Sequence, residues 1–162
     1  MKKILCIGLL LAGVVVNAQI FNSPKETLDV AVFVDPIASE KEGGLDIGME
    51  AGYRGVIYAK AQLENFAVLE GGYTSFGFAV GDVFEQGKIS EYIGLRGALV
   101  WRDGAKNPIL GFEGGIDFEL GNGLRAGLRA TYDWREDMNL LDSGTAEWRF
   151  SGFIKVSKSF DL

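Results

Sequence analysis

Residues 124–134 have the sequence Leu-Arg-Ala-Gly-Leu-Arg-Ala-Thr-Tyr-Asp-Trp, in which every second residue is apolar. Successive side chains of a β-strand point to opposite faces of a sheet. The alternation therefore predicts a strand with Leu, Ala, Tyr and Trp on one face and Arg, Gly, Thr and Asp on the other. The same period of two recurs, segment after segment, from about residue 28 to the C-terminus.

Eight segments carry this pattern, and the connections between them alternate in length. Long outer loops and short periplasmic turns are typical of transmembrane barrels, although any up-and-down sheet shows the same order. The predicted strands are 28–35, 44–54, 56–66, 69–84, 88–102, 108–120, 123–135 and 147–160.

The connections fall into two groups and one exception. The link near 66–69 is the exception, because it is short where the alternation requires a longer loop. The short turns contain the Gly or Asn residues that a positive φ favours. We expect tight turns at Arg54-Gly55, 85–88 and 121–123, and longer or more polar connections at 36–43, 103–107 and 136–146.

The first 18 residues have the parts of a secretory signal peptide. Lys2 and Lys3 form the positive start, an apolar run covers residues 4–16, and Ala18 precedes an acceptable cleavage site. The run is shorter than the roughly 20 residues of a membrane-spanning helix. We therefore predict a cleaved signal, residues 1–18, followed by one domain, residues 19–162.

The composition excludes several classes of function. The chain has no histidine, and its one cysteine, Cys6, is removed by the predicted cleavage. A Ser-His-Asp triad and disulfides are therefore excluded from the mature protein. The net charge of −6 becomes −8 when Lys2 and Lys3 are lost, which argues against nucleic-acid binding. We predict no catalytic residues, no metal site and no cofactor.

The tryptophans favour a membrane barrel over a soluble sheet. Trp101 and Trp134 end their predicted strands and Trp148 begins one, so an up-and-down order places all three at one rim. They lie on the apolar face, and Tyr132 is close to the same rim. Aromatic residues at the membrane–water interface form the girdle of outer-membrane barrels. We therefore predict that these four residues form an aromatic rim.

The length of the uncharged face also fits a membrane. From Trp101 back to Glu91, and from Trp148 on to Lys158, the apolar face carries no charge. About 9–11 tilted residues cross an outer membrane, and a charge near the interface costs little. We expect this face to contact outer-membrane lipid.

The opposite face is rich in glycine and in charges of both signs. Inside a narrow barrel these charges would form a salt-bridged network, and the glycines would leave room for long arginines. An eight-stranded barrel is just wide enough for side chains to fill it. The predicted lumen network is Asp46, Glu50, Lys60, Glu64, Arg96, Arg102, Glu113, Asp117, Glu119, Arg125, Arg129, Asp133, Arg149 and Lys155.

These features resemble the small eight-stranded outer-membrane barrels of the OmpA transmembrane domain and OmpX kind. The resemblance covers nearly the whole mature chain and rests on the export signal, the strands, the aromatic rim and the last strand up to Phe160. Barrels of that kind usually end in an aromatic residue, whereas Asp161 and Leu162 follow here. The resemblance implies an all-β, antiparallel up-and-down transmembrane β-barrel of eight strands in the outer membrane of a Gram-negative-type envelope.

For such a barrel we expect a non-enzymatic, structural or surface-interaction role, carried out by a monomer with a closed lumen. The loops 36–43 and 136–146 are the expected contact surface for a ligand or protein partner. Met138, Leu140 and Leu141 stand out in the second loop as apolar residues among polar ones.

Three other hypotheses stay open from the sequence. A narrow, porin-like pore requires a continuous water path through the lumen. A membrane enzyme would have to use paired carboxylates, such as Asp117 with Glu119 or Glu136 with Asp137, for acid–base catalysis. A soluble secreted β-sandwich or lipocalin-like binding protein would turn the apolar face inward as a core or ligand pocket.

Overall fold

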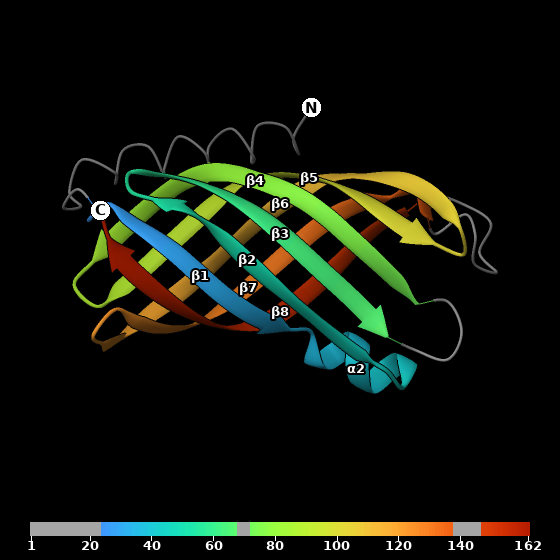
Figure 1. The fold of residues 1–162 in the computed structure, drawn as a ribbon, viewed down its shortest axis with the longest axis horizontal. Coiled ribbons are helices and arrows are strands. Elements are labelled where there is room, and N and C mark those ends of the chain that lie inside the picture. The colour runs from blue at the N-terminus through green and yellow to red at the C-terminus, as the bar shows by residue number, and fades with distance from the viewer. Residues whose placement is uncertain (1–23, 68–71, 138–146) are drawn as a thin grey trace, which may run out of the picture.

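The computed structural model describes residues 24–67, 72–137 and 147–162, which form a closed barrel of eight antiparallel strands. Each strand pairs with its neighbours along the chain, and β1 pairs with β8 to close the ring (Figure 1). The predicted up-and-down transmembrane barrel is therefore confirmed. The strands are β1 (Thr27–Val34), β2 (Leu45–Arg54), β3 (Ile57–Ala67), β4 (Tyr73–Gln86), β5 (Ile89–Arg102), β6 (Ala105–Gly121), β7 (Leu124–Arg135) and β8 (Glu147–Asp161).

A short helix, α2 (Pro36–Glu42), occupies the connection at 36–43 that the sequence predicts as a loop. The side chain of Asp35 accepts hydrogen bonds from two amides of the first turn, at 2.9 and 2.8 Å. Pro36 needs no N–H at the first helical position, and Gly43 ends the helix with a φ of 68°. The loop prediction is wrong because these capping residues together specify a helix. Within the described ranges, no helix is both long and apolar enough to span a membrane.

The connection between β5 and β6 is shorter than the predicted loop at 103–107. β6 begins at Ala105, so only Asp103 and Gly104 form the turn. Both residues have positive φ, 49° and 77°, which is the conformation that Asp-Gly favours in a two-residue hairpin. The polar residues after the turn belong to the strand because they pair with β5.

Two further boundaries differ from the sequence prediction. β3 ends at Ala67 and β4 begins at Tyr73, so this connection is longer than the expected link near 66–69. The predicted start of the fourth strand, residue 69, lies outside the described residues. Arg54 pairs with Thr27 as the last residue of β2, and the tight turn therefore lies after it.

The barrel is apolar on its outside and polar on its inside. Phe78, Leu110 and Phe150 on the outer surface are 62%, 64% and 66% exposed, whereas Asp117 and Arg129 on the inner surface are 1% exposed. A lipocalin-like barrel or a β-sandwich has the opposite arrangement, with the apolar face buried. The structure contradicts that soluble alternative, and the outer surface is suited to hydrocarbon.

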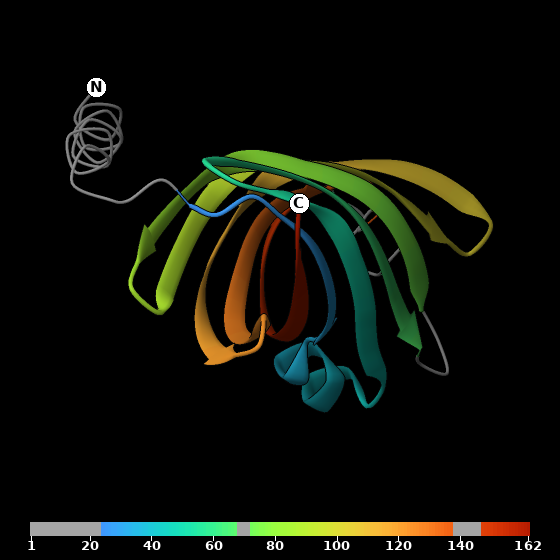
Figure 2. The ribbon, with the colours of Figure 1, turned by 60° about the vertical axis from the view of Figure 1, so that its left-hand side comes forward.

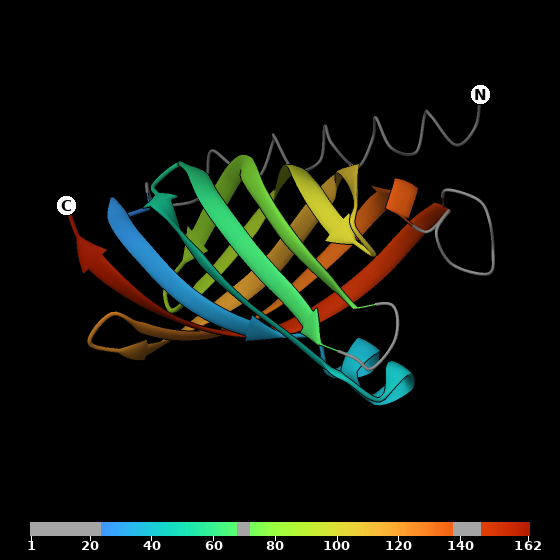
Figure 3. The same ribbon diagram turned by 45° about the vertical axis from the view of Figure 1, so that its right-hand side comes forward.

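The two ends of the barrel are different. The C-terminus and the turns after β2, β4 and β6 lie at one end, and α2 lies at the other (Figures 1 and 3). We call these the turn end and the α2 end. Figure 2 shows α2 beside the end of β1 and the start of β2, outside the ring of strands.

Introducing a charge at two depths on the outer surface tests whether this surface contacts lipid. Leu128 lies in the middle of β7, and Leu124 is the first residue of that strand, at the turn end. Leu128→Arg should lower the free energy of unfolding by about 2–4 kcal/mol, and Leu124→Arg by about 0–1 kcal/mol, because the penalty for a charge is greatest at the bilayer midplane. Urea unfolding in lipid vesicles measures both values. Equal, small effects would show that this surface does not contact hydrocarbon.

Candidate functional site

The barrel interior holds a network of ion pairs around Glu50 of β2. Its carboxylate lies 3.0 Å from Lys60 Nζ, 2.9 Å from Arg129 Nη1 and 3.5 Å from Lys155 Nζ. These cations come from β3, β7 and β8, and none of the four side chains is more than 9% exposed. One buried carboxylate therefore links strands that lie on different sides of the lumen.

A second carboxylate reaches this cluster from β6. Glu113 lies 2.8 Å from Lys60 Nζ and accepts a hydrogen bond from Gln62 at 2.8 Å. Lys60 is therefore shared between Glu50 and Glu113. A buried charge is tolerated only when it is paired and hydrogen-bonded, and the sharing provides a partner for every member of this group.

Arg129 is held by aromatic rings as well as by its ion pair. Its guanidinium carbon lies 3.8 Å from the ring centre of Phe33 and 4.2 Å from that of Phe153. The two rings meet edge to face, with their centres 5.3 Å apart. The planar guanidinium packs favourably on aromatic faces. These contacts and the ion pair with Glu50 fix the direction of the Arg129 side chain.

The network continues toward the turn end through Asp117 of β6. Asp117 lies 3.0 Å from Arg54 Nη1 and 3.0 Å from Lys155 Nζ. Nearer that end, Asp29 of β1 lies 3.3 Å from Arg125 Nη1 of β7. Charges of opposite sign thus alternate along this half of the lumen.

Toward the α2 end, a second group joins β2, β3, β4, β5 and β7. Arg96 Nη1 donates to Asp133 at 2.9 Å. Tyr73 donates its hydroxyl to Glu64, and the same oxygen lies 3.4 Å from Asp46. These groups continue the polar filling of the barrel beyond the Glu50 cluster.

Asp137, just beyond β7, is a carboxylate of the network at the α2 end. Asp137 accepts hydrogen bonds from Arg135 Nε and Nη2 at 2.7 and 2.8 Å, and lies 3.0 Å from Arg102 Nε. Burial alone raises the pKa of Asp137, but the hydrogen bonds and charge of Arg135, together with the charge of Arg102, hold it below its ordinary value. Both arginines also lie against the ring of Tyr73: the guanidinium carbon of Arg102 is 5.0 Å from the ring centre, and that of Arg135 is 4.5 Å from it.

Two inward glycines make room for tyrosine hydroxyls. A side chain on Gly94 would collide with the hydroxyl of Tyr58, and one on Gly115 would collide with that of Tyr92. The sequence predicts that such glycines accommodate arginines. At these two positions that detail is wrong, because tyrosine hydroxyls occupy the space.

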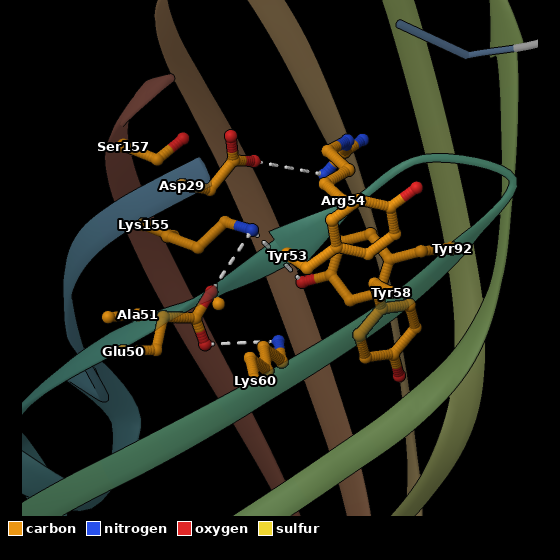
Figure 4. A pocket seen from close by; sticks show the side chains of 11 residues that line it. Asp29, Glu50, Ala51, Tyr53, Arg54, Tyr58, Lys60, Tyr92, Lys155 and Ser157 are labelled. Carbon is orange, nitrogen blue, oxygen red and sulfur yellow. Dashed lines mark hydrogen bonds and ion pairs between the residues drawn. The ribbon is translucent and has the colours of Figure 1, made fainter. Parts of the chain in front are cut away.

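A small cavity remains in the turn-end half of the lumen (Figure 4). Its volume is about 30 Å³, and its lining includes Asp29, Arg54, Lys60, Tyr92 and Lys155. In Figure 4 the charged ends of Glu50 and Lys155 point toward each other beside it. A space of this size holds one or two water molecules, so it is far too small to serve as a water-filled channel.

Two predicted lumen residues are less buried than the others. Glu119 pairs with Arg125 and so has the inward parity of β6, but it is exposed at the turn end and lies outside the buried network. Arg149 is half-buried near the α2 end. The other predicted residues point inward and are buried or nearly so: Asp46, Glu50, Lys60, Glu64, Arg96, Arg102, Glu113, Asp117, Arg125, Arg129, Asp133 and Lys155.

The sequence prediction omits several members of the network. Arg54 and Arg135 have the parity of the inward faces of their strands, and extending the alternation to the strand ends would have found both. Asp29 could have been found in the same way on β1. Tyr73 faces inward despite being aromatic, and Asp137 is buried by the path of the chain after β7, for which the sequence holds no periodic signal.

The carboxylate pairs considered for catalysis are not formed. Asp117 is buried among cations, whereas Glu119 is exposed. Asp137 is buried and bonded to an arginine, whereas Glu136 is exposed. In the described part of the chain, no group of three or more His, Cys, Asp or Glu side chains is placed to hold a metal ion.

The four aromatic residues predicted for a rim lie on the outer surface near the α2 end. Tyr132 stacks on Trp148 with ring centres 4.9 Å apart, and Trp134 meets Trp148 edge-on at 5.8 Å. Trp101 contacts Lys106 Nζ, 5.3 Å from its ring centre. Three apolar loop residues predicted as a contact surface lie outside the described residues: Met138, Leu140 and Leu141.

Comparison with known proteins supports the fold alone. No protein-family model and no curated protein matches the chain. The N-terminal β-barrel domain of Pseudomonas aeruginosa OprF is similar over 86% of this chain and 100% of its own, with 10% identity and a TM-score of 0.57.

Neisserial surface protein A is similar over 87% of this chain and 99% of its own, with 15% identity and a TM-score of 0.54. Ail, the attachment invasion locus protein of Yersinia pestis, is similar over 85% and 99%, with 11% identity and a TM-score of 0.50. The chain therefore has the fold of the small eight-stranded outer-membrane β-barrels, as the sequence predicts.

The stabilising effect of the lumen network can be measured at Arg129. Arg129→Met should lower the free energy of unfolding by about 3–5 kcal/mol, because one partner of a buried ion pair is removed. The value should fall near the lower limit, since Glu50 keeps Lys60 and Lys155. Urea unfolding in vesicles gives this value.

The matched control is Lys25→Met, which breaks the exposed pair of Lys25 with Asp161. An exposed pair contributes about 0–1 kcal/mol. If the two substitutions have the same small effect, the lumen charges do not stabilise the barrel.

Proposed function

We propose that this protein is a non-enzymatic anchor in the outer membrane, with a closed lumen and with its α2 end available to partners outside the cell. The observation that carries the proposal is the set of ion pairs that cross the barrel. Glu50 with Arg129 joins β2 to β7, and Lys60 with Glu113 joins β3 to β6. Because paired side chains fill the cross-section, the ends of the barrel are the surfaces through which it acts.

Three features support the outer membrane as its location. The outer surface is an apolar belt, the fold is that of small outer-membrane barrels, and residues 1–18 are predicted to be a cleaved export signal. Barrels of this kind place short turns in the periplasm and longer connections outside. The turn end accordingly faces the periplasm, and the α2 end faces the exterior.

The proposed contact surface comprises α2 with Gly43, and the connection 136–146. On α2, Ile37 is 62% exposed, and Pro36 and Glu40 are also exposed. A helix fixed by its caps presents these side chains in one geometry, which favours recognition of a protein or other surface ligand. We propose that the barrel itself is a monomer.

The closed lumen is tested by conductance. Planar bilayers that contain the refolded protein should show no current steps above background, because the cavity beside Lys155 and Arg54 has a volume of only about 30 Å³. Insertion is checked on the same preparation by a shift in gel mobility on boiling in SDS. Regular current steps from the inserted protein would refute the closed lumen and support a narrow pore.

The orientation is tested by epitope insertion. An epitope placed between residues 141 and 142 should bind antibody on intact cells, because β7 ends and β8 begins at the α2 end. The matched control places the same epitope between Asn122 and Gly123, in a turn at the other end, and it should bind antibody only after the cells are opened. Labelling of the control alone on intact cells would reverse the proposed orientation.

A further inference from the structure

The barrel wall is incomplete on one side at the α2 end. β1 ends at Val34, opposite Ile154, whereas β8 starts at Glu147. Among the described residues, the segment 147–153 therefore pairs with β7 but with no strand on its β1 side. Pro36 stands where β1 would continue, but it has no N–H to donate and begins α2 instead.

The backbone of β8 presents polar groups on this open side. Leu162 donates its amide to Glu26, which precedes β1. Residues two apart along a strand direct their N–H and C=O groups to the same side, so Trp148, Phe150 and Gly152 direct theirs to the side that β1 has left. An unpaired backbone group in hydrocarbon costs several kcal/mol. The open side therefore favours a neighbour that offers polar atoms.

An apolar groove of about 490 Å³ lies on the outer surface beside this open side. The groove crosses β6, β7 and β8. Small residues that pair in register form its floor, and branched side chains form its walls. Its outward lining includes Ile37, Gly114, Leu128, Ala130, Gly152 and Ile154.

The register of the strands places the groove nearer the α2 end than the turn end. The row of paired residues that contains it starts at Ile57, the first residue of β3 at the turn end, and passes through Gly114 and Gly152. The same row continues past Pro36 to Leu45, at the α2 end. The groove therefore lies in the half of the membrane nearer α2, which is the outer leaflet if the proposed orientation is correct.

We propose that this groove binds one acyl chain of an outer-leaflet lipid, with the lipid carbonyl oxygen accepting hydrogen bonds from the backbone amides of Trp148 and Phe150, which face the open side. The lining is apolar apart from Arg129, whose guanidinium lies inside the barrel and pairs with Glu50, so no charge on the outer surface would select a headgroup. An added polypeptide strand is disfavoured, because α2 packs against β8 beside the open side, with Ile37 near Gly152. α2 thus blocks the path of a strand, while the outward groove stays open to an alkyl chain.

The test uses photo-cross-linking in vesicles of phosphatidylethanolamine that carry a diazirine in the acyl chain. Peptides of β7, β8 and α2 should be labelled above the other strands. Ala130→Leu should lower this excess at least fivefold, because the larger side chain fills the groove. The matched control Ala126→Leu, on the same strand and face but nearer the turn end, should leave the excess unchanged.

Two checks keep the outcome decisive. Both variants must show the mobility shift of a folded barrel, and Gly152→Leu replaces Ala130→Leu if the latter does not fold, since a side chain at Gly152 meets only ordinary contacts. Even labelling around the barrel, or equal effects of Ala126→Leu and Ala130→Leu, would overturn the proposal. The cross-linking result does not depend on conductance or epitope exposure, so it can fail independently of the proposed function.

Discussion

Every other feature of this structure depends on the closure of the hydrogen-bond ladder between β1 and β8. Unpaired backbone groups in hydrocarbon cost several kcal/mol each, so only a sheet without edges can present its outer surface to lipid. Closure turns one face of all eight strands inward at once. The polar face then becomes a confined interior, and the apolar face becomes the surface.

Confinement of the polar face decides how the charges are arranged. Water cannot solvate a narrow lumen filled with side chains, so each charge must find a partner across it. Glu50 satisfies this requirement by sharing three cations, and Asp117 by joining two. The aromatic rings of Phe33 and Phe153 fill the space that remains around Arg129. In the proposed closed state, the pairing that joins the strands across the lumen would also exclude water from it, which would connect the stability of the protein to that state.

Because β1 is short, the pairing between β1 and β8 stops before the α2 end. Asp35 and Pro36 end β1 and start a helix, so β8 loses its neighbour before it reaches the rim. The local preference of these residues for a helix start thus interrupts the backbone hydrogen bonding between β1 and β8. The interruption lies beside an apolar groove and includes Trp148 of the aromatic cluster, and it makes this side of the barrel chemically different from the others.

The sequence by itself determined the strands, their faces and the class of fold, because a period of two needs no knowledge of neighbours. It identified Glu50, Arg129 and Lys155 as interior residues by parity alone. Only the tertiary structure decided which charges meet, since Glu50 and Arg129 are brought together by the path of the chain around the ring. It also decided that Glu119 is exposed, that Asp137 is buried, and that tyrosines rather than arginines occupy the space beside the glycines. Those outcomes depend on register and on the shape of the barrel, and the alternation of residues along a strand contains neither.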